Sequence, residues 1–305
     1  MQQSERENTS CMPSEEVKKT METFKLNNGY DIPQIGFGVF MITDPDECEK
    51  AVVSAFEAGY RLIDTANAYM NERAVGRAMK KSGLPREEIF LTTKIMPQDF
   101  GYEKTKIAID KTLARLDTPY IDLLLLHIRF GDYMGAWKAL EDAVDEGKVH
   151  SIGISNFDEA RIENILKEGR IVPQVDQIEC HPYFQERTLR KLLDKHDIRV
   201  ESFYPVGHGD KNLLSEAVFA ELGEKYGKSP VQIILKWHIQ EGFVPLPKST
   251  NPQHIKDNIS LGFTLTEEDM DKIRAIDKDT SYFNTPEEDQ EKMFLTQNID
   301  FDAQE

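Results

Sequence analysis

Cysteine, basic charge and long apolar runs are all scarce in this sequence. The three cysteines, Cys11, Cys48 and Cys180, are odd in number and far apart, so they form neither a metal-binding spacing nor a disulfide framework. No apolar run approaches the roughly 20 residues that a membrane span needs, and the polar N-terminus has no secretory signal. These absences predict a cytoplasmic protein with no membrane partner.

Basic residues are outnumbered by acidic ones. Lys and Arg total 37 and Asp and Glu total 54, which gives a formal net charge of -17. This balance argues against nucleic acid or an anionic membrane as a general partner, although it allows a local basic pocket for one phosphate. The seven histidines are dispersed without carboxylate support, so no metal site is expected.

The 305 residues are compatible with one large α/β domain. We expect residues 1–21 to be a disordered tail, a long start or an added segment, and residues 22–285 to form the folded domain. The stretch 25–33 carries an Asn-Gly turn between short apolar pieces, which predicts a hairpin. The acidic residues 286–305 are expected either to wrap the surface or to fray.

Short apolar runs alternate with segments of helical length and period after the hairpin. These runs predict buried parallel strands, and they lie at 34–40, 61–64, 89–94, 121–127, 150–155, 174–179, 198–203 and 243–248. Eight strand–helix units favour a closed (β/α)8 TIM barrel in a single domain. The alternative is an open doubly wound sheet, but its G-x-G-x-x-G signature is incomplete in GFGVFM (36–41).

Polar side chains stand where the second, third and fourth strands end. The second strand ends at Asp64 with Tyr69 just beyond it, the third ends at Lys94 and the fourth ends at His127. In such barrels the ends of the strands form one face, and this face carries the active site. A Lys ammonium about 4 Å from a phenol would lower its pKa by about 3 units before desolvation opposes it. We therefore expect Tyr69 to exchange protons near neutral pH. Taken singly, each residue is equally compatible with packing, loop capping or a solvated strand end.

Six segments in order resemble the aldo-keto reductase family: RLIDTANAYMNE (61–72), TTK (92–94), IDLLLLH (121–127), GKVHSIGISNF (147–157), PQVDQIECHPYFQ (173–185) and VPLPKSTNPQHIKDN (244–258). The resemblance covers about residues 23–285. It implies a (β/α)8 barrel that reduces aldehydes or ketones to alcohols with NADP(H). It also implies that Asp64, Tyr69, Lys94 and His127 are catalytic, with Tyr69 as general acid.

The same resemblance assigns a set of cofactor-binding residues. Ser155, Asn156 and Gln177 correspond to the side chains that hold the nicotinamide carboxamide, and Phe203 to the ring that stacks on it. A one-residue shift would put Tyr204 in that place. The adenosine end is assigned to Lys248, Ser249, Asn251, His254, Asp257 and Asn258. His254 replaces the usual Arg, which weakens the expected preference for NADPH and predicts partial acceptance of NAD(H).

The expected substrate pocket departs from the family pattern. Phe40, Met96 and Ile128 stand where aromatic residues are frequent, and Arg129 follows them. An inward-pointing Arg129 would attract a carboxylate or phosphate, whereas an outward one would be a solvated loop residue. Asp176 stands where the family frequently has Asn.

Two other functional classes stay open from the sequence. A non-catalytic nucleotide-binding member of the same family would keep the cofactor residues without turnover. An unrelated barrel enzyme, such as a phosphate-substrate isomerase or lyase, would keep only the fold. The physiological carbonyl substrate and the oligomeric state are left undecided by the sequence, and a monomer is compatible with it.

Overall fold

The computed structural model describes residues 21–305. The predicted N-terminal tail, apart from Met21, lies outside this range. The predicted hairpin is confirmed: β1 (Thr23–Lys25) pairs antiparallel with β2 (Asp31–Pro33). Leu26 and Ile32 of this hairpin belong to the apolar cluster inside the barrel, so the hairpin plugs one end of it.

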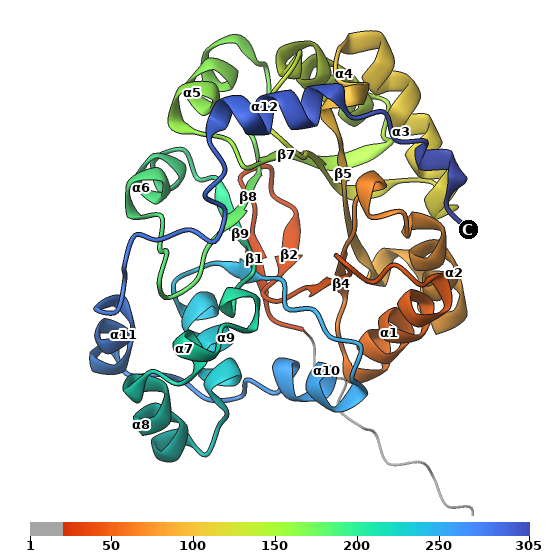
Figure 1. Cartoon of the computed structure of the whole chain (residues 1–305). Coiled ribbons are helices and arrows are strands. Elements are labelled where there is room, and N and C mark those ends of the chain that lie inside the picture. The colour runs from red at the N-terminus through yellow and green to blue at the C-terminus, as the bar shows by residue number, and fades with distance from the viewer. Residues whose placement is uncertain (1–20) are drawn as a thin grey trace, which may run out of the picture.

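Eight parallel strands follow the hairpin and are surrounded by helices (Figure 1). Each neighbouring pair is hydrogen-bonded in chain order, which is the topology predicted for a (β/α)8 barrel. The strands are β3 (Phe37–Gly38), β4 (Leu62–Asp64), β5 (Phe90–Ile95), β6 (Ile121–Leu126), β7 (Val149–Ser155), β8 (Val175–Glu179), β9 (Arg199–Phe203) and β10 (Val244–Pro245).

The first and last strands of the barrel approach each other through two backbone hydrogen bonds. Gly36 N donates to Pro245 O, and Gly38 N donates to Pro247 O, both at 3.1 Å. A Cβ atom at Gly36 would overlap the side chains of Leu62 and Leu246. Glycine is therefore required for the close approach that completes the ring.

The helices occupy the segments between the strands and form the outer layer. Their boundaries follow local signals: α9 begins with a capping box between Ser229 and Gln232, and α1 ends at Gly59 in the left-handed conformation. The helices are α1 (Pro45–Ala58), α2 (Glu72–Ser82), α3 (Tyr102–Leu116), α4 (Tyr133–Asp145), α5 (Glu159–Glu168), α6 (Arg187–Lys195), α7 (Lys211–Leu214), α8 (Ala217–Tyr226), α9 (Pro230–Gln240), α10 (Pro252–Ile259), α11 (Glu267–Arg274) and α12 (Glu287–Thr296).

The barrel interior changes from apolar to polar along its axis. Near the hairpin it is filled by apolar side chains such as Leu62, Phe90 and Val175. Two residues further along the same strands, the side chains that point inward are those of Asp64, Thr92 and Gln177. The strands therefore bring polar groups together at their carboxyl ends, above an apolar base.

The C-terminal residues 281–305, here called the C-terminal strap, wrap around the barrel, which is one of the two expected outcomes. Helix α12 lies across the end of the barrel between the α5 and α3 sides (Figure 1). Phe301 is buried, and Asp302 pairs with Arg115 and Lys111 of α3 at 2.8 Å. Gln304 Oε1 accepts from Arg73 N at 3.1 Å. The end of the chain is thus fixed to the barrel wall.

Candidate active site

Four polar side chains meet at the carboxyl end of the barrel. Asp64 ends β4, Tyr69 lies in the 3-10 turn after it (Asn67–Tyr69), and Lys94 lies in β5. The Lys94 Nζ atom donates to both carboxylate oxygens of Asp64 and to Thr65 O at 2.8 Å, and it lies 3.3 Å from the Tyr69 hydroxyl. One ammonium group therefore joins the acid to the phenol.

The ammonium of Lys94 is fully buried, yet it stays charged. Burial acts to lower the pKa of Lys94, but the adjacent Asp64 carboxylate and Tyr69 hydroxyl outweigh it, so that the pKa is raised. Asp64 is itself almost completely buried. The two charges compensate each other inside the barrel, and removal of either would leave the other buried and unpaired.

The phenol of Tyr69 departs from the sequence prediction. Burial raises the pKa of Tyr69 to about 12, and this effect is larger than the lowering by Lys94. The expectation of proton exchange near neutral pH was wrong in direction, because it gave too little weight to desolvation. In this structure Tyr69 holds its proton throughout the physiological pH range and is placed to act as a donor.

His127 follows β6 and faces Tyr69 edge-on, with ring centroids 5.6 Å apart. Burial, together with the charge of Lys94, lowers the pKa of His127 well below its ordinary value. The imidazole is therefore neutral at physiological pH and keeps a single N–H donor. Tyr69 and His127 both line the same cavity, so two neutral donors face one space.

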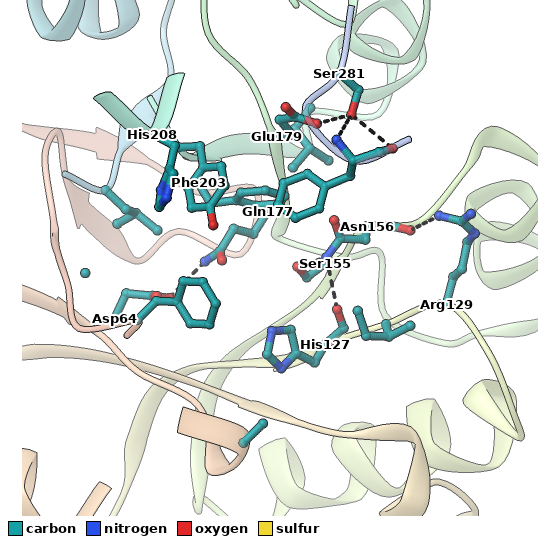
Figure 2. A pocket seen from close by; sticks show the side chains of 18 of the residues that line it. Asp64, His127, Arg129, Ser155, Asn156, Gln177, Glu179, Phe203, His208 and Ser281 are labelled. Carbon is teal, nitrogen blue, oxygen red and sulfur yellow. Dashed lines mark hydrogen bonds between the residues drawn. The ribbon is translucent and has the colours of Figure 1, made fainter. Parts of the chain in front are cut away.

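That cavity has a volume of about 950 Å3 and lies in the range that accommodates a small-molecule ligand. Figure 2 shows Ser155, Asn156 and Gln177 beside it, at the ends of β7 and β8. Asn156 Nδ2 donates to His127 O at 3.2 Å and to Ser155 Oγ at 3.0 Å. These bonds occupy the amide nitrogen and leave the amide oxygen of Asn156 available to the cavity.

Aromatic rings form one wall of the cavity. Phe203 ends β9 on the same inward face as Glu201, whereas Tyr204 has a positive φ of 49°. The Tyr204 ring stacks on Phe283 of the C-terminal strap with ring centroids 5.3 Å apart, and it lies tilted against His208 with ring centroids 4.5 Å apart. Both Phe203 and Tyr204 line the cavity, and the strand alternation favours Phe203 as the inward ring.

The predicted adenosine-end residues lie around the start of α10. Lys248 lines the cavity and is exposed, and it forms no ion pair with any residue of the described range. Asn251 caps α10 by accepting from Gln253 N at 2.9 Å. The remaining residues of this group lie outside the lining of the cavity and are Ser249, His254, Asp257 and Asn258.

The four predicted substrate-pocket residues, Phe40, Met96, Ile128 and Arg129, all line the cavity. Arg129, however, is not a free cation. Its Nε lies 3.7 Å from carboxylate oxygens of both Asp158 and Glu287, and its guanidinium donates to Asn156 O at 3.2 Å. Arg161 pairs with the same two carboxylates, so the four groups form one network, and attraction of an anionic substrate by Arg129 stays a prediction.

The sequence analysis missed the part of the cavity formed by the C-terminal strap. Phe283, Met293 and Phe294 line it, and no motif in this acidic segment indicated that. It also missed how Glu179 holds the start of the strap. Glu179 accepts hydrogen bonds from the Ser281 hydroxyl, from Tyr282 N at 2.8 Å and from His181 at 3.1 Å.

A metal centre is not indicated by the arrangement of possible ligands. Across residues 21–305, no group of three or more His, Cys, Asp or Glu side chains is placed to hold a metal ion. None of the helices in that range combines the length and the apolar character that a membrane crossing requires.

Comparison with known proteins places this geometry in a family. The sequence model of the aldo/keto reductase family matches residues 34–278. The chain is 42% identical over 265 residues to a 9,11-endoperoxide prostaglandin H2 reductase of Trypanosoma cruzi, covering 86% of this chain and 94% of that protein. It is 41% identical over 269 residues to a glyoxal reductase of Bacillus subtilis, covering 88% and 97%.

A solved structure agrees with the sequence comparisons. The crystal structure of a Bombyx mori aldo-keto reductase in complex with NADP superposes with a TM-score of 0.82 at 32% identity, covering 87% of this chain and 95% of that one. The fold and the order of the site segments are therefore shared over almost the whole barrel.

Proposed function

The chain belongs to the aldo/keto reductase family, and from this premise we propose that Asp64, Tyr69, Lys94 and His127 carry out its carbonyl reduction. The protein is an NADP(H)-dependent oxidoreductase that converts aldehydes or ketones to alcohols. The observation that carries the proposed roles is the hydrogen-bond distance of 3.3 Å from Lys94 Nζ to the Tyr69 hydroxyl, deep in the cavity.

The side chains of the cavity fit a nicotinamide cofactor. Ser155, Asn156 and Gln177 offer a hydroxyl and two amides, which match the donor and acceptor of a carboxamide group. The unpaired Lys248 supplies a positive charge for a phosphate. When bound, the cofactor supplies the hydride. We propose that NADPH is preferred and that NADH is partly accepted, because His254 lacks the permanent charge of an arginine.

Tyr69 is the proposed general acid. Its raised pKa keeps the proton on the phenol until a carbonyl oxygen gains negative charge beside it. Lys94 stabilises the phenolate that remains, and Asp64 keeps Lys94 charged and in place. The neutral imidazole of His127 donates a second hydrogen bond to the same oxygen, so that two fixed donors polarise the carbonyl.

The substrate proposed here is a small, uncharged aldehyde or ketone. Aliphatic and thioether side chains such as Ile128, Met96 and Met293 line the cavity. Carboxyl groups of Glu159 and Glu179, which pair with no Lys or Arg of residues 21–305, also line it, and these disfavour anions. The glyoxal reductase relative makes a dicarbonyl such as glyoxal the first compound to assay.

The non-catalytic alternative gains no support from the relatives, which are named as reductases. The unrelated-barrel alternative is excluded by family membership. We further propose that the protein acts in the cytoplasm. Two buried free thiols, Cys48 and Cys180, support that location.

Tyr69→Phe tests the proposed catalytic role. Loss of one donor to a developing oxyanion typically lowers turnover by about 10²–10³-fold, and we expect a loss of this size. The dissociation constant for NADPH should stay close to that of the unmodified protein. Turnover is measured as NADPH oxidation with glyoxal and a panel of aldehydes and ketones, and binding by calorimetry.

Tyr102→Phe is the matched control, because its hydroxyl contacts Asp142 on the protein surface. Full activity in this control together with a large loss in Tyr69→Phe supports the assignment. Equal losses of turnover and of NADPH affinity in Tyr69→Phe would contradict it.

A further inference from the structure

Glu201 is a buried carboxyl in β9 that the proposed roles leave unused. Its side chain is fully buried and faces the barrel interior. The residue paired with it on β8 is Gln177, and the residue paired with it on β10 is Val244. Neither neighbouring strand therefore offers Glu201 a cation, which is unusual for a carboxyl at this depth.

A single nitrogen atom joins Glu201 to the catalytic acid. Gln177 Nε2 donates to Glu201 Oε2 at 2.9 Å and to Asp64 Oδ2 at 2.9 Å. A primary amide nitrogen carries two hydrogens, so both are used by these two carboxyl groups. The amide oxygen of Gln177 is then the atom left for the cavity, where Figure 2 shows this side chain.

The charges around Glu201 keep it neutral at physiological pH. Burial, followed by the nearby Asp64 carboxylate, raises the pKa of Glu201 to about 8, while the Gln177 amide and Lys94 oppose this shift. Its second oxygen, Oε1, has no hydrogen-bond partner within the described residues. Glu201 therefore changes charge just above neutral pH, beside the Asp64–Lys94 pair.

We propose that Glu201 is a positioning residue for the nicotinamide: through Gln177 it fixes which amide atom faces the cofactor, and its ionisation shifts the relative affinity for the oxidised and reduced cofactor. The proposal rests on the carboxamide-binding role proposed for Gln177. It adds a residue that touches neither substrate nor cofactor and acts through its neighbour.

The charge of the nicotinamide ring decides which cofactor form an ionised Glu201 favours. The oxidised nicotinamide ring is positive and the reduced ring is neutral, so an ionised Glu201 favours the oxidised form. A unit charge about 10 Å away at an effective dielectric near 20 changes the affinity for a cation by on the order of tenfold. Of the other groups near Glu201, Lys94 and Tyr69 both have raised pKa values. Glu186, which also lines the cavity, has its pKa raised by burial to about 7.

The test compares Glu201→Gln with the unmodified protein. Dissociation constants for NADPH and for NADP+ are measured by calorimetry between about pH 7 and about pH 9, a range that brackets the titration of Glu201. The ratio of the two constants cancels the titration of groups that both cofactor forms share. We expect the ratio of the NADPH to the NADP+ constant to rise several-fold with pH in the unmodified protein and to rise clearly less in Glu201→Gln, which retains only the contribution of Glu186.

Asp176→Asn is the matched control. Asp176 is also a fully buried carboxyl on β8, but it faces the helices and does not line the cavity. This variant should keep the pH-dependent ratio. The same rise in Glu201→Gln as in the unmodified protein would overturn the electrostatic part of the proposal.

Glu201→Leu tests the orientation of Gln177, because it removes the acceptor and frees one amide hydrogen. We expect weaker binding of both cofactor forms, whereas Glu201→Gln retains an acceptor and should bind NADPH at neutral pH as the unmodified protein does. Unchanged NADPH affinity in Glu201→Leu would overturn the positioning role. If the leucine variant fails to fold, a loss of NADPH affinity in Glu201→Gln at neutral pH would overturn that role instead.

Failure of this proposal is distinguishable from failure of the proposed catalytic roles. The binding titrations need no turnover, whereas Tyr69→Phe is judged by turnover. If Gln177→Ala binds both cofactor forms as tightly as the unmodified protein, the carboxamide-binding role proposed for Gln177 is wrong.

Discussion

At the scale of single residues, Asp176 stands out because no hydrogen bond offsets the burial of its carboxyl group. Neither of its oxygens has a hydrogen-bond partner in residues 21–305. Burial, followed by the charges of Glu186 and Asp158, raises the pKa of Asp176 well above its ordinary value. An aspartate that must keep its proton in the folded state while the unfolded chain releases it destabilises the fold as pH rises.

Asp176→Asn is therefore expected to be more stable than the unmodified protein at pH 7. In the unfolded chain an aspartate titrates near about pH 4, so the native state binds the extra proton only above that pH. A tenfold difference in proton affinity between the two states corresponds to about 1.4 kcal/mol, and we expect a gain of at least about 1 kcal/mol at neutral pH. Urea unfolding at pH 7 and near pH 4 measures it, and a gain of equal size at both would contradict the explanation.

His254 is the residue at which cofactor preference can be tested. It is exposed on α10, close in sequence to the unpaired Lys248. An arginine there would add a permanent charge and a two-pronged hydrogen-bond donor for a phosphate. His254→Arg should raise the ratio of kcat/KM with NADPH to that with NADH by about tenfold, the effect of one charged hydrogen bond of roughly 1.5 kcal/mol.

The matched control for this change is His254→Gln, which adds no charge at neutral pH. It should leave the cofactor ratio close to that of the unmodified protein. A ratio that is unmoved by arginine would mean that α10 does not contact the adenosine end of the cofactor as proposed.

At the scale of elements, the strands were predictable and the C-terminal strap was not. Runs such as IDLLLLH (121–127) contain apolar residues on both faces, and the structure places β6 at Ile121–Leu126 because both faces are buried. The strap contains few apolar residues, and its docking depends on partners far away in the chain, such as Arg115 and Glu179. Local pattern carries no information about such contacts.

The strap provides a prediction at this scale. Its end is held by the buried Phe301, whose burial contributes about 1.5–3 kcal/mol, and by the half-exposed Asp302, whose ion pairs contribute at most about 1 kcal/mol. Deletion of residues 300–305 should loosen α12 over the cavity. We expect KM for the carbonyl substrate to rise several-fold, with little change in the dissociation constant for NADPH.

Steady-state kinetics and NADPH calorimetry on the deletion variant test this expectation. Lys292→Ala, at an exposed position of α12, is the control and should leave KM unchanged. A deletion variant that loses NADPH affinity in the same proportion would show that the strap supports the whole barrel rather than the cavity mouth.

At the scale of the whole molecule, closure of the barrel explains how much of the site could be predicted. Closure brings the ends of consecutive strands to one face, so residues such as Asp64, Lys94 and Gln177 could be grouped from their strand positions alone. Their protonation could not be predicted in this way. The pKa of Tyr69 depends on how completely the cavity wall excludes water, and that is a property of packing.

The same limit applies to Arg129 and Glu201. Arg129 was assessed from its place after β6, but it faces Glu287 of the strap, more than a hundred residues away in the sequence. Glu201 stands in an otherwise ordinary strand, IRVESF (198–203). Its contact with Gln177 can be recognised only when β9 is placed beside β8. In both cases the decisive partner is distant along the chain.

The C-terminal strap is held along its length, by Glu179 at Ser281 and Tyr282, by Gln98 at Ile299 and by α3 at Asp302. Several residues between these contacts, among them Phe283, Met293 and Phe294, line the cavity without belonging to a barrel strand or to a helix between two strands. The shape of the cavity mouth therefore depends on a segment that follows the last barrel strand, and a substitution there would reshape the mouth without removing Asp64, Tyr69 or Lys94.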